Sequence, residues 1–224
     1  MPDVLQPFWL SLKLAFVTTF LLFLLAIPIV YLVYFYSGRM KPLLKAVVSM
    51  PLVLPPTVLG YYLLLLLRPQ GWLGQLSAQL FDARLVFSFP GLVIGSLIFS
   101  LPFMINPVLS ALENLPDSYR EAAFTLGKSR WNTLRKVLLP NVSSSLLVAI
   151  VMTFAHTIGE FGVILMIGGN IPGETRVASI AIYNEVEMLN FAQADLYALS
   201  LLIFSFVVLL LIYFFQNRRS KGII

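Results

Sequence analysis

The sequence predicts an all-α polytopic membrane protein with about five transmembrane helices, and three observations lead to this fold class. Of its 224 residues, 59% are hydrophobic and only 11% are charged. In a typical soluble domain about 45–50% of the residues are apolar and about 25% are charged. The apolar residues are gathered in blocks long enough to cross a bilayer. The basic residues are concentrated after the first, third and fifth blocks.

The composition also excludes several classes of protein. A mean hydropathy of +0.90 excludes a water-soluble or disordered chain. The chain has no cysteine, which excludes disulfides and iron–sulfur clusters, and its single histidine excludes a multi-histidine zinc site. We therefore expect no metal and no cofactor on this chain. The net charge of +5 would suggest nucleic acid in a soluble protein, but in a membrane protein the position of the charges matters more.

Five apolar blocks are the candidate spans. Even a block of 22 residues reaches about 33 Å as a helix, which exceeds a hydrocarbon core of about 30 Å. Prolines inside the blocks each remove a backbone hydrogen bond and are expected to bend the helices, either for packing or to line a pathway. The blocks cover residues 8–36, 46–67, 89–112, 142–167 and 194–215, with prolines at Pro28, Pro51, Pro55, Pro56, Pro90, Pro102 and Pro107.

The charges predict how the spans are oriented. Eleven of the fifteen Lys and Arg residues follow the first, third or fifth block, among them Arg39, Arg120 and Arg218. Acidic residues such as Asp3 and Glu174 fall on the opposite side. Because positively charged loops stay in the cytoplasm, we expect the N-terminus outside and the C-terminus in the cytoplasm.

The cytoplasmic segment 113–141 is predicted to form two short helices. Ser118 and Glu121 have the spacing of a capping box, and Gly127 is placed to end the first helix in a left-handed conformation. Ser129 is placed to cap the second helix, and Pro140 breaks the chain before the fourth span. Each helix has an apolar face, made of Tyr119, Ala122, Ala123 and Leu126 in the first and of Trp131, Leu134, Val137 and Leu138 in the second.

Two interpretations of this segment are disfavoured. The spacing of Ala123 and Gly127 and the basic charge are compatible with a DNA-binding helix-turn-helix, but two membrane spans hold its ends away from a major groove. Gly127-Lys128-Ser129 matches the end of a phosphate-binding loop, but Ala122 replaces the first glycine and no strand precedes it. We therefore expect no nucleic-acid partner and no nucleotide site on this chain.

The same segment resembles the EAA loop of ABC importer permeases. Glu121-Ala122-Ala123, Gly127 and Val137-Leu138-Leu139-Pro140 have that spacing, and Val137, where isoleucine is commoner, is the only departure. The resemblance implies a single transmembrane permease domain over residues 1–224 with the type I ABC importer permease fold, in the bacterial inner membrane. It also implies that the loop docks on a separate ATPase, through Glu121, Ala122, Ala123, Gly127, Leu139 and Pro140.

Further stretches are similar to molybdate permeases and narrow the resemblance. They are Trp9–Lys13, Met50–Leu67 and Gly159–Tyr183. The resemblance implies import of molybdate or tungstate; because some of these blocks are shared, a sulfate or thiosulfate permease is the alternative. The implied partners are two ATPase subunits that bind ATP and Mg²⁺, a periplasmic substrate-binding protein and a second copy of the permease. This chain is then a transport subunit and not itself an enzyme.

The fourth block carries a polar stripe. Polar and ionisable side chains inside a membrane usually face the interior of a helix bundle or a water-filled cavity. The stripe is therefore a candidate for the translocation pathway or its gate, and interhelical hydrogen bonding is the alternative. A carboxylate repels an anionic substrate, which favours packing or gating for Glu160. His156 and Glu160 have too few companions for a metal site, and no nucleophile accompanies them for an intramembrane enzyme. The stripe comprises Thr153, His156, Thr157 and Glu160, at i, i+3, i+4 and i+7.

Four basic residues lie outside the cytoplasmic clusters. Lys13 is inside the start of the first span, and Arg68, Arg84 and Arg176 are on the outer side. They could attract an oxyanion or meet acidic residues of a docking protein. For Lys13, a side chain that reaches the membrane interface is the commoner explanation.

Overall fold

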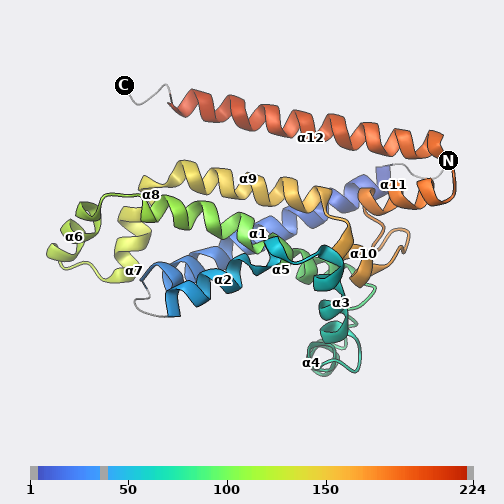
Figure 1. The fold of residues 1–224 in the computed structure, drawn as a ribbon, viewed down its shortest axis with the longest axis horizontal. Helices are drawn as coiled ribbons and strands as arrows, with labels where there is room; N and C mark the ends of the chain where they lie inside the picture. Colours follow the sequence, from blue (N-terminus) through green and yellow to red (C-terminus); the bar gives the residue numbers. More distant parts are fainter. Residues whose placement is uncertain (1–4, 36–39, 221–224) are drawn as a thin grey trace.

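The computed structural model describes residues 5–35 and 40–220, and over these residues the fold is built of helices with no strand. Asp3, Tyr36, Arg39 and Lys221, which entered the span and charge predictions, lie outside the described residues. Three helices lie lengthwise together in the bundle, namely α1 (Leu5–Phe35), α5 (Phe89–Glu113) and α9 (Ser143–Gly159) (Figure 1).

The first and third predicted spans are continuous helices. α1 runs through Pro28, and α5 runs through Pro102 and Pro107. Ser88 caps α5 by accepting a hydrogen bond from the backbone N–H of Gly91, at 3.4 Å. These helices and the Phe191–Leu210 part of α12 (Phe191–Ser220) are long and apolar enough to cross a membrane.

The second predicted span, residues 46–67, is divided into two helices with a sharp bend at its prolines, as the prolines led us to expect. It consists of α2 (Met40–Val53) and α3 (Pro56–Leu67), and the helix direction bends by 109° between them. The cause is the pair Pro55-Pro56. Pro55 holds φ at −54° and ψ at 135°, and Pro56 cannot donate the hydrogen bond that would continue α2.

The fourth predicted span, residues 142–167, is also interrupted. α9 ends at Gly159, and α10 (Gly162–Gly168) begins after the non-helical Glu160 and Phe161. At its other end α9 meets the preceding helical segment Arg130–Asn141 at 82°. If each bent pair counts as one span, the described residues hold up to five candidate spans.

Shorter helices lie at the two ends of the bundle. At one end are α6 (Asp117–Thr125), α7 (Arg130–Thr133), the π-helix η1 (Leu134–Leu138) and α8 (Leu139–Asn141). At the other end are α4 (Trp72–Phe81), α10 and α11 (Ala178–Glu187) (Figure 1). α12 packs mainly against α11, and most of its length is exposed in the isolated chain.

Candidate functional site

The segment between the third and fourth spans starts with α6, whose first residue differs from the prediction. The helix begins at Asp117, after Pro116, and no side chain caps it, so the capping box predicted at Ser118 and Glu121 is wrong. Pro116 explains the earlier start, because its ring fixes φ at −54°. The carboxylate of Asp117 is favourable in the first turn of a helix, and it also pairs with Arg120 at 2.9 Å.

The end of α6 is as predicted. Gly127 has φ of +71°, in the left-handed region. Its N–H donates to the carbonyl of Phe124 at 2.9 Å, and the N–H of Lys128 donates to the carbonyl of Ala123 at 3.0 Å. These are the two hydrogen bonds of a Schellman motif, which ends α6 and reverses the chain direction.

The second helix of the segment changes type along its length. Ser129 caps it as predicted, accepting a hydrogen bond from the N–H of Asn132 at 3.3 Å. The N–H of Leu139 then bonds the carbonyl of Leu134, five residues back, which is the π-helical pattern. Pro140 accounts for this departure, because it has no N–H for the carbonyl of Lys136 and its ring would clash there.

Side chains of this second helix fix the segment to the bundle. Leu134 and Leu138 are fully buried in the same core cluster as Val30 of α1 and Leu112 of α5. The ring of Trp131 lies edge-on to Tyr31 of α1, with centroids 5.5 Å apart. The segment is therefore a packed extension of the bundle.

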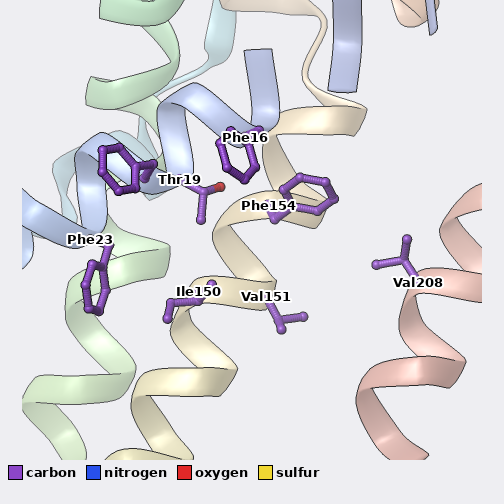
Figure 2. Close-up of a pocket in the computed structure, with 8 residues that line it drawn as sticks. Phe16, Thr19, Phe23, Ile150, Val151, Phe154 and Val208 are labelled. Atoms are coloured by element: carbon purple, nitrogen blue, oxygen red, sulfur yellow. The ribbon is translucent and has the colours of Figure 1, made fainter. Parts of the chain in front are cut away.

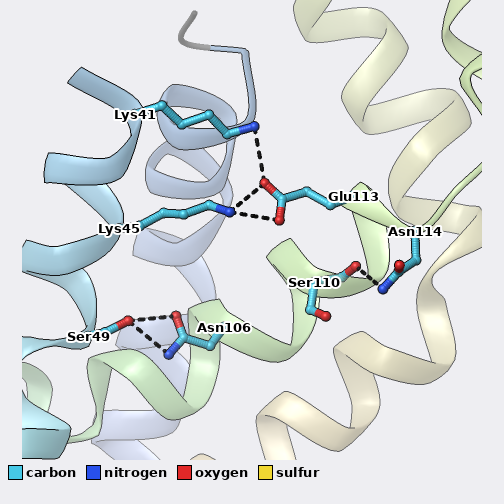
Figure 3. A network of polar contacts seen from close by, with 7 residues as sticks. All are labelled: Lys41, Lys45, Ser49, Asn106, Ser110, Glu113 and Asn114. Carbon is cyan, nitrogen blue, oxygen red and sulfur yellow. Dashed lines mark hydrogen bonds and ion pairs between the residues drawn. The ribbon is translucent and has the colours of Figure 1, made fainter. Parts of the chain in front are cut away.

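Ion pairs at the start of the segment add to this attachment (Figure 3). Glu113, the last residue of α5, accepts from Lys45 at 2.8 Å and pairs with Lys41 at 3.1 Å, both on α2. One turn deeper, Ser49 and Asn106 exchange hydrogen bonds at 3.2 and 3.4 Å. α2 is thus held against the end of α5 where the segment begins.

The apolar side chains of α6 are exposed. Leu126 is 77% exposed, and Tyr119 and Phe124 are 41% and 40% exposed. Phe124 was not singled out from the sequence, although an apolar residue in a mostly polar helix was a signal for it. We call these side chains with their exposed neighbours the α6 surface, made of Tyr119, Glu121, Ala122, Phe124, Leu126 and Gly127.

The predicted docking residues divide into two groups. Glu121, Ala122 and Gly127 are exposed on the α6 surface, and Pro140 is exposed farther along. Ala123 is buried, and Leu139 is half-buried against the core cluster that contains Leu134. In this conformation the latter two shape the segment and do not present their side chains to a partner. The exposed basic residues beside the α6 surface are Lys128, Arg130, Arg135 and Lys136.

The polar stripe of the fourth span faces α5. Ser96 Oγ donates to Glu160 Oε2 at 2.7 Å, and Ser100 Oγ lies 3.1 Å from Thr157 Oγ1. Thr153 and Thr157 also donate to carbonyls one turn back in α9. The structure therefore places Thr157 and Glu160 in an interhelical hydrogen-bond set with α5, whereas the hydroxyl of Thr153 bonds only within α9. Ser96 and Ser100 were not predicted to belong to this site, although their four-residue spacing on a predicted span was a signal.

His156 belongs to the same set and is partly buried. Its Nδ1 lies 2.9 Å from Ser100 Oγ. The imidazole stacks on Phe103 with centroids 4.0 Å apart, and Phe99 lies at 4.9 Å. Among the described residues, no group of three or more acidic or histidine side chains is placed to hold a metal ion.

The outer basic residues occupy different environments. Arg68 and Arg84 line a cavity of about 1060 Å³ together with the acidic Asp82 and Glu174. Arg176 donates to the side chain of Asn170. Lys13 places Nζ 4.5 Å from the ring centroid of Phe89. The cavity has acidic as well as basic groups, so it is not a simple site for an anion.

An apolar groove of about 370 Å³ separates α12 from the bundle (Figure 2). Its lining carries no charged side chain, which makes it unsuited to an anion and suited to lipid chains or another apolar helix. The lining residues are Phe16, Thr19, Phe20 and Phe23 of α1, Ile150, Val151 and Phe154 of α9, and Val208 of α12.

Sequence comparisons match almost the whole chain to known transport proteins. Residues 14–222 match the family described as binding-protein-dependent transport system inner membrane component. The molybdenum transport system permease protein ModB of Azotobacter vinelandii is 43% identical over 213 residues, covering 95% of this chain and 93% of that protein. The sulfate transport system permease protein CysT of Salmonella typhimurium is 30% identical over 223 residues, covering 100% and 80%.

Solved structures share the fold at lower identity. A bacterial ABC transporter involved in alginate import has a chain that matches with a TM-score of 0.76 and 18% identity, covering 100% of this chain and 81% of that one. The MetNI methionine ABC transporter, in an inward-facing conformation, matches with a TM-score of 0.70 and 19% identity, covering 96% and 94%. The expected type I ABC importer permease fold is confirmed. By sequence and fold, the chain belongs to the family of binding-protein-dependent transport system inner membrane components.

Proposed function

We propose that this chain is the membrane-spanning permease subunit of an ABC importer that carries molybdate or tungstate into the cell. The observation that supports the coupling role is the α6 surface. Its apolar side chains are exposed although the segment that carries them is packed firmly on the bundle. Exposed apolar patches on otherwise polar segments mark protein contacts. The resemblance of the segment to an EAA loop assigns this contact to an ATPase subunit.

The attachment of the segment suits it to transmit force. A partner that moves the α6 surface also moves η1, because α6 packs on η1. η1 is in turn buried against α1 and α5 through Leu134 and Leu138. α9 starts two residues after α8, so the same displacement reaches the fourth span. The buried Ala123 allows α6 to pack closely on η1 and α7.

The substrate follows from the relatives. The molybdenum permease from Azotobacter vinelandii is 43% identical, and the sulfate permease from Salmonella typhimurium is 30% identical, each over nearly the whole chain. Identity is higher to the former, so molybdate or its analogue tungstate is the proposed cargo. Sulfate or thiosulfate is the second candidate, because sulfate permeases align over the full length.

The proposed complex contains two permease copies as a homodimer, two ATPase subunits that bind ATP and Mg²⁺, and a periplasmic protein that delivers the anion. The complex lies in the inner membrane, with the N-terminus outside and the α6 surface in the cytoplasm. ATP binding closes the cytoplasmic side through α6 and opens the outer side, and hydrolysis resets the complex. This chain supplies the path and the coupling surface and has no nucleotide site of its own.

The polar residues Thr153, His156, Thr157 and Glu160 are proposed to act on the pathway indirectly. The side-chain contacts of His156, Thr157 and Glu160 run to α5, and the hydroxyl of Thr153 bonds within α9. This favours control of how α9 sits on α5 over direct contact with the anion in transit.

The docking proposal is tested by co-purification of the ATPase subunit with permease variants. Glu121→Arg and Gly127→Trp alter the α6 surface and should abolish co-purification. Glu174→Arg makes the same charge change on an exposed loop at the other end of the bundle and should leave it intact. Normal co-purification with the α6 variants would overturn the docking proposal.

The substrate is tested by uptake of molybdate into cells that carry the complete transport system, with and without a large excess of sulfate. Uptake that persists under sulfate supports the molybdate and tungstate assignment. Uptake that sulfate abolishes moves the assignment to a sulfate-type permease and leaves the coupling proposal unchanged.

A further inference from the structure

The buried apolar residues form separate clusters at the two ends of the bundle. We call residues 113–141, which carry the α6 surface, the coupling segment. The cluster nearer α6, called here the inner core, contains Leu134 and Leu138 of this segment and the adjoining parts of α1, α2, α5 and α9. Two clusters nearer α10 and α11, together called the outer core, join α10 to α1, α3, α5 and α11. On α5, for example, Leu92 and Val93 belong to the outer core, and Met104 and Ile105 belong to the inner core.

A layer of buried polar side chains separates the two cores on three helices. On α1, Thr18 and Thr19 lie between Leu14 of the outer core and Leu22 of the inner core. The hydroxyls of Thr18 and Thr19 have no hydrogen-bond partner among the described residues. Leu97 packs against both cores. The polar layer consists of the buried Thr18, Thr19, Ser96, Ser100, Thr153, Thr157 and Glu160, and of the partly buried His156.

Apolar cores pack in one best arrangement, because close-packed side chains resist sliding. A polar layer is held by a few directional hydrogen bonds. These bonds can break in one arrangement of the helices and form again with other partners in a second arrangement. The layer is therefore the place where the inner part of the bundle can change its position relative to the outer part with least loss of packing.

Glu160 is the residue of this layer that lies at the break in the fourth span. Its carboxylate accepts from Ser96 of α5 at 2.7 Å, and its backbone carbonyl accepts from Ser179 of α11 at 2.6 Å. Its own N–H reaches the carbonyl of Thr157 only at 3.4 Å. Glu160 is 3% exposed, and Oε1 has no partner among the described residues. Two serines of other helices thus hold Glu160, while its bond to α9 is long.

The chain on either side of Glu160 belongs to different parts of the bundle. α9, before it, packs on α1 and α5 and begins just after the coupling segment. α10, after it, packs on α3 and α5. Gly159 and Gly162 flank the break. Between them the backbone leaves the helical conformation, at Glu160 and Phe161.

We propose that Ser96 and Ser179 are positioning residues for transport, which hold Glu160 and α10 on the outer core while α9 moves with the α6 surface. The non-helical break at Glu160 and Phe161 is the hinge between α9 and α10. This inference rests on the proposed function, because it takes the α6 surface to be the point where the ATPase acts.

The transport test uses the complete complex in liposomes, with molybdate uptake and ATP hydrolysis measured in parallel. Ser96→Ala should retain ATPase binding and ATP hydrolysis but lower the molybdate imported per ATP severalfold, because the hydrogen bond that holds Glu160 on α5 is lost. Ser96→Thr keeps the hydroxyl and should restore the ratio. Ser200→Ala is the matched control, because Ser200 bonds only its own helix.

Two results would overturn the proposal. The first is a ratio in Ser96→Ala within twofold of the unmodified protein. The second is an equally low ratio in Ser200→Ala, since the loss would then not depend on the hydrogen bond to Glu160.

A distance measurement tests the same residues without the ATPase, so it separates failure of this inference from failure of the proposed function. The chain has no cysteine, so spin labels can be placed on the exposed Met152→Cys of α9 and Val186→Cys of α11. The distance distribution should broaden in Ser96→Ala and in Ser179→Ala and stay narrow in Ser200→Ala. An unchanged distribution in the first two variants would refute the positioning role even if the ATPase docks as proposed.

Discussion

Replacement of Gly127 by alanine tests whether the shape of the coupling segment matters separately from its chemistry. Gly127 has φ of +71°, and a Cβ added there would meet no atom within 4 Å. The change therefore creates no clash, and its cost is the left-handed conformation itself, about 1–2 kcal/mol for a residue with a Cβ. If the α6 surface must keep this turn to fit its partner, ATPase binding weakens by roughly 5- to 30-fold, since 1.4 kcal/mol is tenfold.

The assay is equilibrium binding of the purified ATPase subunit to the permease in lipid nanodiscs. Gly127→Asn is the control, because asparagine adds a larger side chain but tolerates the left-handed region. It should bind close to the unmodified protein. Normal binding of the Gly127→Ala variant would refute the need for the left-handed turn. A Gly127→Asn variant as defective as Gly127→Ala would refute it too, because the loss would then follow side-chain size at the contact.

Three further predictions concern the attachment of the segment and the outer surface. Leu134→Ala removes a fully buried side chain of the inner core and should destabilise the protein by about 2–5 kcal/mol, seen as a lower thermal aggregation temperature in detergent. Glu113→Gln removes the ion pairs to the two lysines of α2 and should cost about 0.5–1 kcal/mol in the same assay, less than Leu134→Ala. Tyr183 donates to Glu187 at 2.6 Å, and this hydrogen bond raises the pKa of Tyr183. Glu187→Gln should lower that pKa toward its usual value in an ultraviolet titration referenced to Tyr183→Phe, and an unchanged curve would contradict the contact.

The coupling segment shows what local sequence signals can predict. Gly127 and Ser129 act within one turn of the chain, through a left-handed φ and a side-chain cap, and both predictions were confirmed. The capping box at Ser118 failed because Pro116 competes for the same helix start through its fixed φ. Local rules conflict where two residues that can start a helix lie close together. Here the fixed φ of Pro116 was stronger than the capping preference of Ser118.

The sequence alone did not predict which prolines in the apolar blocks would end a helix. Pro28, Pro102 and Pro107 lie within continuous helices. At Pro55-Pro56, by contrast, α2 ends and the direction of the chain bends by 109° into α3. A single proline removes one hydrogen bond, which surrounding packing can compensate. Two adjacent prolines restrict the residue before each ring as well, so the helix ends.

Apolar block length, glycine and serine positions and motif spacing are local properties of the chain. The helical membrane class, the approximate spans, the coupling segment and the family resemblance could therefore be predicted from the sequence. Which faces of α6 and α9 are exposed or buried depends on the packing of the helices. This packing exposed Leu126, paired Glu113 with α2, and joined Ser96 of α5 to Glu160 across 64 positions of sequence. Such contacts depend on how whole helices pack, and no periodicity within one segment carries that information.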